Sequence, residues 1–321
     1  MTFHLKTLAA AVGVTLLALA PEAAAACALQ TVGVLDVDLS RGVPIVDGEI
    51  NGVATKMMID TGSLATIITA PAAKALGLAP STTPGGYVFG IGGRDDADAM
   101  LPSSLTIGTL HVTKPPPLLV SGAIAGLPDV SMLVGEDFLS QFDVELDMAN
   151  HVIRLFHAEG CTAPQLVYWN KPYSQATIEP GAQIMTIAGL NGSRVRAIVD
   201  TGASTSLVEA SAAAGAGEAN PSHPSLVGTG LGPQPRQAWT DEFASVAIGD
   251  ERIANARIQV SPFGGDFSWI DTDSRIGRRM DTPSMLIGED FLGAHRVLVD
   301  FKDRVMVFSY NGGPIFSAGA P

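Results

Sequence analysis

The feature that most constrains the fold of this 321-residue chain is an internal duplication. Residues 58–63, Met-Ile-Asp-Thr-Gly-Ser, return 140 residues later as Ile-Val-Asp-Thr-Gly-Ala at 198–203. Residues 131–139, Ser-Met-Leu-Val-Gly-Glu-Asp-Phe-Leu, return 153 residues later at 284–292 with one substitution. Repeats in a fixed order indicate two copies of one structural unit. The second copy is longer at 262–282, where we expect the copies to differ.

The residues around these repeats predict short strands. Apolar or alternating segments bounded by Gly, Asn or Asp occur at 44–50, 56–59, 152–156 and 184–187. A short helix is expected after Pro71, with Gly77 interrupting it. The 35 glycines and 21 prolines suit a turn-rich fold. We expect a mostly β protein with two similar lobes about a pseudo-twofold axis, each carrying one or two short helices. The expected divisions are a signal peptide at 1–26, lobes at 27–160 and 174–311, a crossover at 161–173 and a flexible tail at 312–321.

The first 26 residues have the pattern of an export signal. The apolar run 8–20 follows Lys6, and three alanines at 24–26 offer a cleavage site. The run is too short to span a membrane, and no later stretch reaches spanning length. We therefore expect an exported protein, periplasmic or secreted, with no membrane span. The net charge of −13 and the lack of Lys/Arg runs indicate that nucleic acid is not a partner.

The chain has two cysteines, Cys27 and Cys161. In an oxidising compartment a disulfide between them would tie the first strand to the end of the first lobe, and we favour this pairing. Lipid attachment at Cys27 is disfavoured because Ala24 is a poor match to the Leu usually found three residues before a lipidated cysteine. Two buried free thiols are the other alternative.

An Asp-Thr-Gly turn follows an apolar strand in each half, so Asp60 and Asp200 lie at strand ends where Gly permits a tight turn. A single such motif is commonly an ordinary turn. Two copies at equivalent positions are more specific, because twofold packing can bring equivalent points face to face on the axis. We expect Asp60 to lie opposite Asp200.

With these motifs the chain resembles the pepsin and retropepsin clan of aspartic peptidases. The resemblance rests on Asp-Thr-Gly-Ser at 60–63, Asp-Thr-Gly-Ala at 200–203, and the apolar-apolar-Gly segments 133–135 and 286–288. It implies an endopeptidase that activates a water between Asp60 and Asp200, one carboxyl protonated and the other charged. No cofactor and no metal are implied. The expected partner is a peptide or protein substrate, and a monomer is expected because both lobes lie in one chain.

The resemblance also implies roles for residues near the two acids. The Ser63 hydroxyl is expected to hydrogen-bond Asp60, which Ala203 cannot do for Asp200. Asp60 is therefore expected to act as the base and Asp200 to hold the proton. The two threonines are expected to brace the turns against each other. The supporting residues of the two turns are Thr61, Gly62, Ser63, Thr201, Gly202 and Ala203.

A glycine-rich hairpin in each half lies where the clan keeps a flap over its cleft. The alternative for the first hairpin is an ordinary turn whose aromatic residues fill the core, and the 262–282 loop is either a specificity element or tolerated surface. The flap candidates are Tyr87, Val88, Phe89, Gly90, Ile91, Gly92, Gly230, Leu231 and Gly232.

Other functions find weaker support in the sequence. The six histidines lack His-Glu-x-x-His spacing, and the glycine runs lack the strand, loop and helix of a nucleotide site. The acid pairs 136–137 and 289–290 follow the apolar-apolar-Gly segments and are expected to form local hydrogen bonds. The alternative function is a pepsin-like module that binds peptides or inhibitors without cleavage. Retention of both aspartates favours a peptidase.

Overall fold

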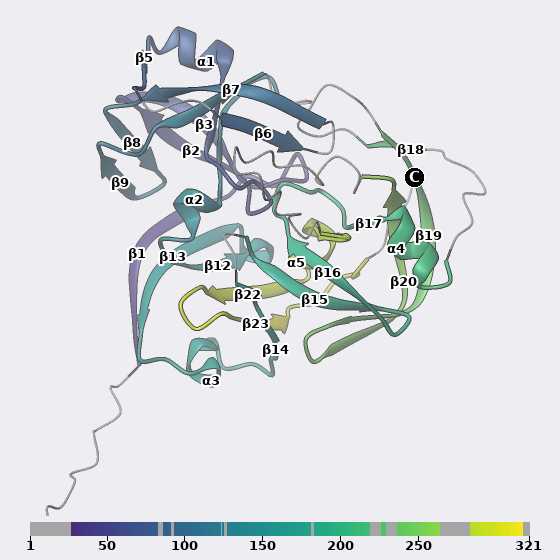
Figure 1. The fold of residues 1–321 in the computed structure, drawn as a ribbon. Coiled ribbons are helices and arrows are strands. Elements are labelled where there is room, and N and C mark those ends of the chain that lie inside the picture. The colour runs from purple at the N-terminus through teal and green to yellow at the C-terminus, as the bar shows by residue number, and fades with distance from the viewer. Residues whose placement is uncertain are drawn as a thin grey trace, which may run out of the picture.

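The structure is a computed structural model, which describes residues 27–82, 86–90, 93–122, 124, 127–180, 183–218, 226–228, 236–263 and 283–316. The expected signal segment 1–26, most of the 262–282 loop and the end of the chain lie outside these ranges. Strands dominate the described chain and form three sheets (Figure 1). One sheet belongs to each half and the third is shared. The mostly β fold with two similar lobes is confirmed.

The first sheet is built by the first repeat and runs β5-β7-β10-β4-β11-β3-β2-β8-β9, with β6 paired to β7. Strand β11 lies between β3 and β4, parallel to β3 with Val134 opposite Ile59. Helix α1 (Ala70–Ala75) follows β4 and ends before Gly77, whose φ is +59°, and α2 (Glu136–Leu139) follows β11. The strands are β2 (Ile45–Ile50), β3 (Val53–Ile59), β4 (Ile67–Thr69), β5 (Ala79–Pro80), β6 (Gly86–Gly90), β7 (Gly93–Leu101), β8 (Ser104–Ile107), β9 (Leu110–Thr113), β10 (Leu118–Ser121) and β11 (Val130–Val134).

The second sheet repeats this plan in the order β15-β16-β21-β17-β20-β19-β18. Strand β21 lies between β16 and β17, with Ile287 opposite Val199. Its long pair β19 and β20 stands where the first half has four shorter strands, because Pro102 and prolines 115–117 interrupt the first half and no proline occurs at 236–261. The elements are β15 (Met185–Leu190), β16 (Ser193–Val199), β17 (Leu207–Glu209), α4 (Ala210–Gly215), β18 (Leu226–Gly228), β19 (Arg236–Ile248), β20 (Glu251–Ser261), β21 (Met285–Ile287) and α5 (Glu289–Leu292).

The third sheet takes strands from both halves in the order β1-β13-β12-β22-β23-β14 (Figure 1). Val144 lies opposite Val299, and Leu146 lies opposite Val297. Residues 144 and 146 correspond to 297 and 299 in the repeat. Exchanging the two halves therefore leaves the pairing unchanged, which places a twofold axis between β12 and β22. The division of the chain into domains stays a prediction, because this sheet joins the halves. The elements are β1 (Ala28–Asp36), β12 (Asp143–Asp147), η1 (Met148–Asn150), β13 (Val152–Glu159), α3 (Ala163–Leu166), β14 (Ser174–Thr177), β22 (His295–Asp300) and β23 (Val305–Tyr310).

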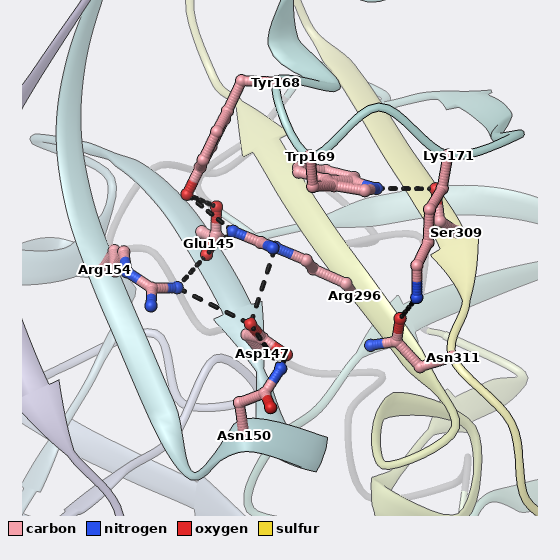
Figure 2. A network of polar contacts seen from close by, with 10 residues as sticks. All are labelled: Glu145, Asp147, Asn150, Arg154, Tyr168, Trp169, Lys171, Arg296, Ser309 and Asn311. Carbon is pink, nitrogen blue, oxygen red and sulfur yellow. Dashed lines mark hydrogen bonds and ion pairs between the residues drawn. The ribbon is translucent and has the colours of Figure 1, made fainter.

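A buried ionic network crosses the junction between the halves (Figure 2). Arg296 of β22 donates from Nη2 to Glu145 Oε1 at 3.0 Å, and its Nε lies 3.6 Å from Asp147 Oδ2. Both acids belong to β12 and are 0% and 1% exposed. Arg154 of β13 forms ion pairs with the same two carboxylates. Two guanidinium groups therefore balance two buried acids where the repeats meet.

The segment after α3 covers this network with aromatic side chains. The guanidinium carbon of Arg296 lies 4.9 Å from the ring centre of Tyr168 and 4.7 Å from that of Trp169. The Tyr168 hydroxyl donates to Glu145 Oε2 at 2.5 Å, and Trp169 donates to the Ser309 hydroxyl at 2.8 Å. Cation–π contacts of this kind add to the ion pairs. The expected crossover thus contacts strands of both halves.

The first shared strand is also held covalently. Cys27 and Cys161 form a disulfide, which joins the start of β1 to the residues just beyond β13. This agrees with the pairing favoured from the sequence. Across the described ranges, no helix combines the length and the apolar character that a membrane crossing requires.

Candidate active site

The two Asp-Thr-Gly turns follow β3 and β16 and have the same backbone geometry. The N–H of Asp60 donates to the carbonyl of Val134 at 3.0 Å, and that of Asp200 donates to Ile287 at 2.9 Å. Each turn closes when the N–H three residues after the acid donates to the carbonyl of that acid, at 3.2 Å in both halves. Strands β11 and β21 therefore fix the backbone position of the aspartate in their own half of the chain.

The apolar-apolar-Gly segments contact the turns directly. A Cβ added to Gly135 would lie 2.4 Å from the carbonyl oxygen of Ala65, and one added to Gly288 would lie 2.6 Å from that of Ala203. These distances are too short for any side chain, so glycine is required at both positions. The apolar-apolar-Gly segment therefore packs directly against the Asp-Thr-Gly turn in each half.

The two turns are braced against each other by Thr61 and Thr201. The Thr61 hydroxyl donates to the Val199 carbonyl at 2.7 Å and accepts the N–H of Thr201 at 3.1 Å. The Thr201 hydroxyl donates to the Ile59 carbonyl at 2.7 Å and accepts the N–H of Thr61 at 3.1 Å. Both threonines are 0% exposed. This reciprocal set fixes the distance between the halves at the turns.

The structure brings Asp60 and Asp200 together. A Cβ added to Gly62 would lie 2.4 Å from Asp200 Cγ, and one added to Gly202 would lie 2.6 Å from Asp60 Oδ1. Each carboxyl thus lies over the glycine of the opposite turn, and the two side chains hydrogen-bond each other. Asp60 is 7% exposed and Asp200 is partly buried. We call these two residues the carboxyl pair.

Burial raises the pKa of both members of the carboxyl pair. The pKa of Asp200 is raised well above its ordinary value, because the charge of Asp60 adds to the burial. Asp60 Oδ1 accepts the N–H of Gly62 at 3.0 Å and of Ser63 at 3.1 Å, which favours its ionised form. Asp200 Oδ1 likewise accepts the N–H of Gly202 at 2.9 Å, so burial and mutual repulsion oppose ionisation of both acids at once.

The expected hydrogen bond from the Ser63 hydroxyl to Asp60 was wrong. That hydroxyl donates to the carbonyl of Ala65 at 2.8 Å, and Asp60 receives the backbone N–H of Ser63 instead. A backbone N–H is available whatever the side chain, so the Ser/Ala difference does not set the asymmetry. The roles of Asp60 as base and Asp200 as proton holder stay predictions, because the turn amides hydrogen-bond both carboxylates.

Gln183 is a site residue that sequence reasoning missed. Its amide nitrogen donates to the Gly62 carbonyl at 2.9 Å, so the second half reaches across to the first turn. The equivalent position in the first repeat is Val43, which has no donor. A polar residue opposite an apolar one in aligned repeats is the signal that could have identified it.

The flap candidates are only partly described. Strand β6 pairs antiparallel with β7, with Gly90 opposite Gly93, so the first candidate flap has the backbone of a hairpin. The side chains of residues 87–90 lie outside the described part of the structure, as do residues 91–92 and 230–232 in full. The roles of these residues stay predictions.

The acid pairs after the glycines make local hydrogen bonds through their aspartates. The Thr66 hydroxyl donates to Asp137 Oδ1 at 2.6 Å, and the Ser206 hydroxyl donates to Asp290 Oδ1 at 2.5 Å. Each hydroxyl also accepts the N–H of the glycine before the acid pair, at 3.1 and 2.9 Å. These aspartates therefore tie the supporting segment to the strand that follows each turn.

Comparisons with known proteins agree with this geometry. Residues 46–141 match the family model described as "gag-polyprotein putative aspartyl protease", and residues 185–291 match the model "Aspartyl protease". The UBA domain-containing protein Mud1 of Schizosaccharomyces pombe is 31% identical over 139 residues, which are 43% of this chain and 39% of Mud1. The chain therefore spans about two fifths of the length of this curated relative.

Two solved structures are similar. The aspartic proteinase of Irpex lacteus aligns over 91% of this chain and 99% of its own, with 13% identity and a TM-score of 0.50, which shows a shared fold. A retropepsin-like aspartic protease of Rickettsia conorii aligns over 41% of this chain and 95% of its own, with 20% identity and a TM-score of 0.30. The two family matches together cover well over half of the sequence, one in each repeat. The chain belongs to the pepsin and retropepsin clan of aspartic peptidases.

Proposed function

We propose that this protein is an aspartic endopeptidase that hydrolyses peptide bonds with a water held between Asp60 and Asp200. The observation that carries the proposal is the carboxyl pair itself, two hydrogen-bonded acids that lie over each other's turn glycines. Two carboxyls this close cannot both ionise cheaply, so one proton stays between them. Such a pair can give and take a proton in one step.

The chemistry follows from that single proton. Asp60, ionised, takes a proton from the water as the water oxygen attacks the peptide carbonyl carbon, while Asp200 gives its proton to the carbonyl oxygen. The proton on Asp60 then passes to the peptide nitrogen as the C–N bond breaks, and the hydroxyl proton returns to Asp200. The threonine brace supports this scheme, because fixed turns keep both acids in position throughout.

The finer features remain part of the proposal. We place the lobes at 27–160 and 174–311, joined by 161–173, with the glycine-rich hairpins as flaps over a peptide or protein substrate. The disulfide is consistent with an extracellular protein, and export to the periplasm or the medium is proposed on that basis and on the pattern at 1–26. A monomer suffices, since one chain carries both turns.

The test is cleavage of unfolded casein by the purified protein from acidic to neutral pH, with the new chain ends identified by mass spectrometry. Cleavage within the substrate, insensitive to a metal chelator, is the expected result. Peptide binding without cleavage at any pH would favour the non-catalytic module instead.

Adding one methyl group at a turn glycine is expected to disable the site. In Gly62→Ala the new Cβ would overlap the Asp200 carboxyl at 2.4 Å, and in Gly202→Ala it would overlap Asp60 at 2.6 Å. A displacement of this size costs about 10²-fold in rate, so kcat should fall about 10²-fold with a smaller change in KM. Gly215→Ala is the matched control, because nothing lies within 4 Å of its added Cβ. Full activity in both turn variants would contradict the packing of the carboxyl pair.

A further inference from the structure

Two glutamates beside the carboxyl pair have no part in the proposed reaction. Glu136 begins α2 and Glu289 begins α5, at equivalent places in the two repeats. Glu136 is 0% exposed and neither of its carboxyl oxygens has a hydrogen-bond partner. Glu289 is partly buried, and its Oε1 is also buried without a partner. Unpaired buried carboxyls oppose folding, so their presence calls for an explanation.

Both glutamates are attached to the Asp-Thr-Gly turns. The N–H of Glu136 donates to the Ser63 carbonyl at 2.9 Å, and the N–H of Glu289 donates to the Ala203 carbonyl at 2.9 Å. The preceding glycines contact the same turns, so each glutamate is anchored beside one Asp-Thr-Gly turn. Any change in its charge is therefore felt at the carboxyl pair.

In the part of the chain that the structure describes, the titratable groups that act on these side chains are all acidic. Asp60 at the end of β3 and Asp137 in α2 act on Glu136, and with burial they raise its pKa to about 9. Asp200 at the end of β16 and Asp290 in α5 act on Glu289, and with burial they raise its pKa to about 8. Within the described ranges, neither glutamate forms an ion pair with a basic side chain.

We propose that Glu136 and Glu289 are proton-holding positioning residues that stay neutral, so that neither adds a buried negative charge next to the carboxyl pair. This inference rests on the proposed peptidase function. When a glutamate loses its proton, an unpaired charge forms in a buried place beside the carboxyl pair, which already carries one. The two glutamates therefore set the alkaline limit at which the turns and the pair keep their geometry.

Packing alone does not account for them. A methionine at either position would fill a similar volume without unpaired oxygens, and such swaps usually cost little. The acid is nevertheless present in both copies of the nine-residue segment, which differs at one position between the repeats. What the acid adds over methionine is a carboxyl that is neutral when protonated and can ionise beside each turn.

The proposal has a consequence for stability that does not depend on catalysis. In the unfolded chain a glutamate has its ordinary pKa of 4.5, whereas the folded values are about 9 and about 8. Between these limits the folded state holds protons that the unfolded state has released. The contribution of these glutamates to stability is therefore greatest in acid, falls as pH rises through this window and levels off above the folded pKa. Each glutamate should raise the unfolding equilibrium constant about tenfold per pH unit from about pH 5 to 8.

The experiment measures urea unfolding at several pH values in wild type, Glu136→Gln, Glu289→Gln and the double variant. Each replacement should remove about one proton from the number released on unfolding. The unfolding equilibrium constant of the double variant should therefore rise about a hundredfold less per pH unit than that of wild type. Glu49→Gln, which removes an exposed acid of β2, should follow wild type. Curves for the glutamine variants that run parallel to wild type would overturn the proposal. Glu136→Met and Glu289→Met serve if an amide prevents folding, with the same expected loss of slope.

A second measurement tests the link to the site. In the double glutamine variant the alkaline limb of kcat/KM is expected to move to higher pH. An unmoved limb together with a changed stability slope would mean that the glutamates do not limit the site, and would overturn that part of the inference. If the protein cleaves nothing, the unfolding curves still decide whether the glutamates hold protons, so failure of the peptidase function is distinguishable.

Discussion

Asp60→Asn and Asp200→Asn are each expected to lower kcat/KM for a peptide substrate by about 10²- to 10⁴-fold. An amide cannot take a proton from water or give one to the carbonyl oxygen. Loss of Asp60 also removes the repulsion that raises the pKa of Asp200, and loss of Asp200 removes the proton donor itself. The two variants should therefore be similarly impaired, and the double variant little worse than either. Single-turnover assays at the optimum pH are the measurement.

The loss is expected without unfolding. Burial raises the pKa of both acids, so their ionisation opposes folding near neutral pH, and the amides remove that penalty. Asp36→Asn, which changes an exposed acid at the end of β1, is the matched control and should retain activity. Cleavage that survives in either variant of the carboxyl pair would remove the pair from the mechanism.

Arg296→Ala is expected to lower the free energy of unfolding by about 3 to 5 kcal/mol. The change leaves Glu145 and Asp147, both almost wholly buried, with only Arg154 to balance them. It also exposes the stacked face of Trp169. An unpaired buried charge costs far more than the pair contributes, which makes single truncation the severe case. Urea unfolding at constant pH gives the measurement.

The repeat supplies the rescue for this variant. Leu298 stands in the second half where the first has Glu145, so the fold already accepts leucine there. Arg296→Met combined with Glu145→Leu leaves the Arg154–Asp147 pair and should recover most of the lost stability. Arg252→Ala in β20 removes an exposed arginine and is the control. A loss in Arg296→Ala no greater than in this control would show that the network contributes little.

The repeat explains why so much of the site was accessible from sequence. Two Asp-Thr-Gly turns at one offset require equivalent positions, and twofold packing then places Asp60 against Asp200 without any knowledge of intervening loops. The same reasoning gave the strands around each turn. This reasoning works because the position of the site depends on symmetry between the two repeats, and the constant spacing of the repeats is visible in the sequence.

What the sequence could not provide depends on choices between local alternatives. The Ser63 hydroxyl has an acceptor in Ala65 as well as in the nearby carboxylate, and spacing does not say which it selects. The Gln183 side chain hydrogen-bonds the turn of the other half, a contact that hydrophobic periodicity does not predict. Glu136 follows an apolar strand and begins a short helix, a place where an acid commonly points to water. Only the packing around it shows that this acid is buried.

The shared sheet was also hidden from the sequence, because strand pairing between halves leaves no pattern in either strand. The register of β12 and β22 puts Asp147 opposite Arg296 at one end. By the same register, Asp143 faces Asp300 at the other end, and burial together with that charge raises the pKa of Asp143 to about 6. The junction is thus symmetric in backbone but unequal in charge.

The glycine of each turn contacts a residue that is far away in the sequence. Gly62 makes room for a side chain 138 positions later, and Gly202 makes room for one 142 positions earlier. A larger residue in one copy would damage the acid belonging to the other, however well its own copy tolerated it. Each turn glycine is therefore constrained by the other half of the chain as well as by its own.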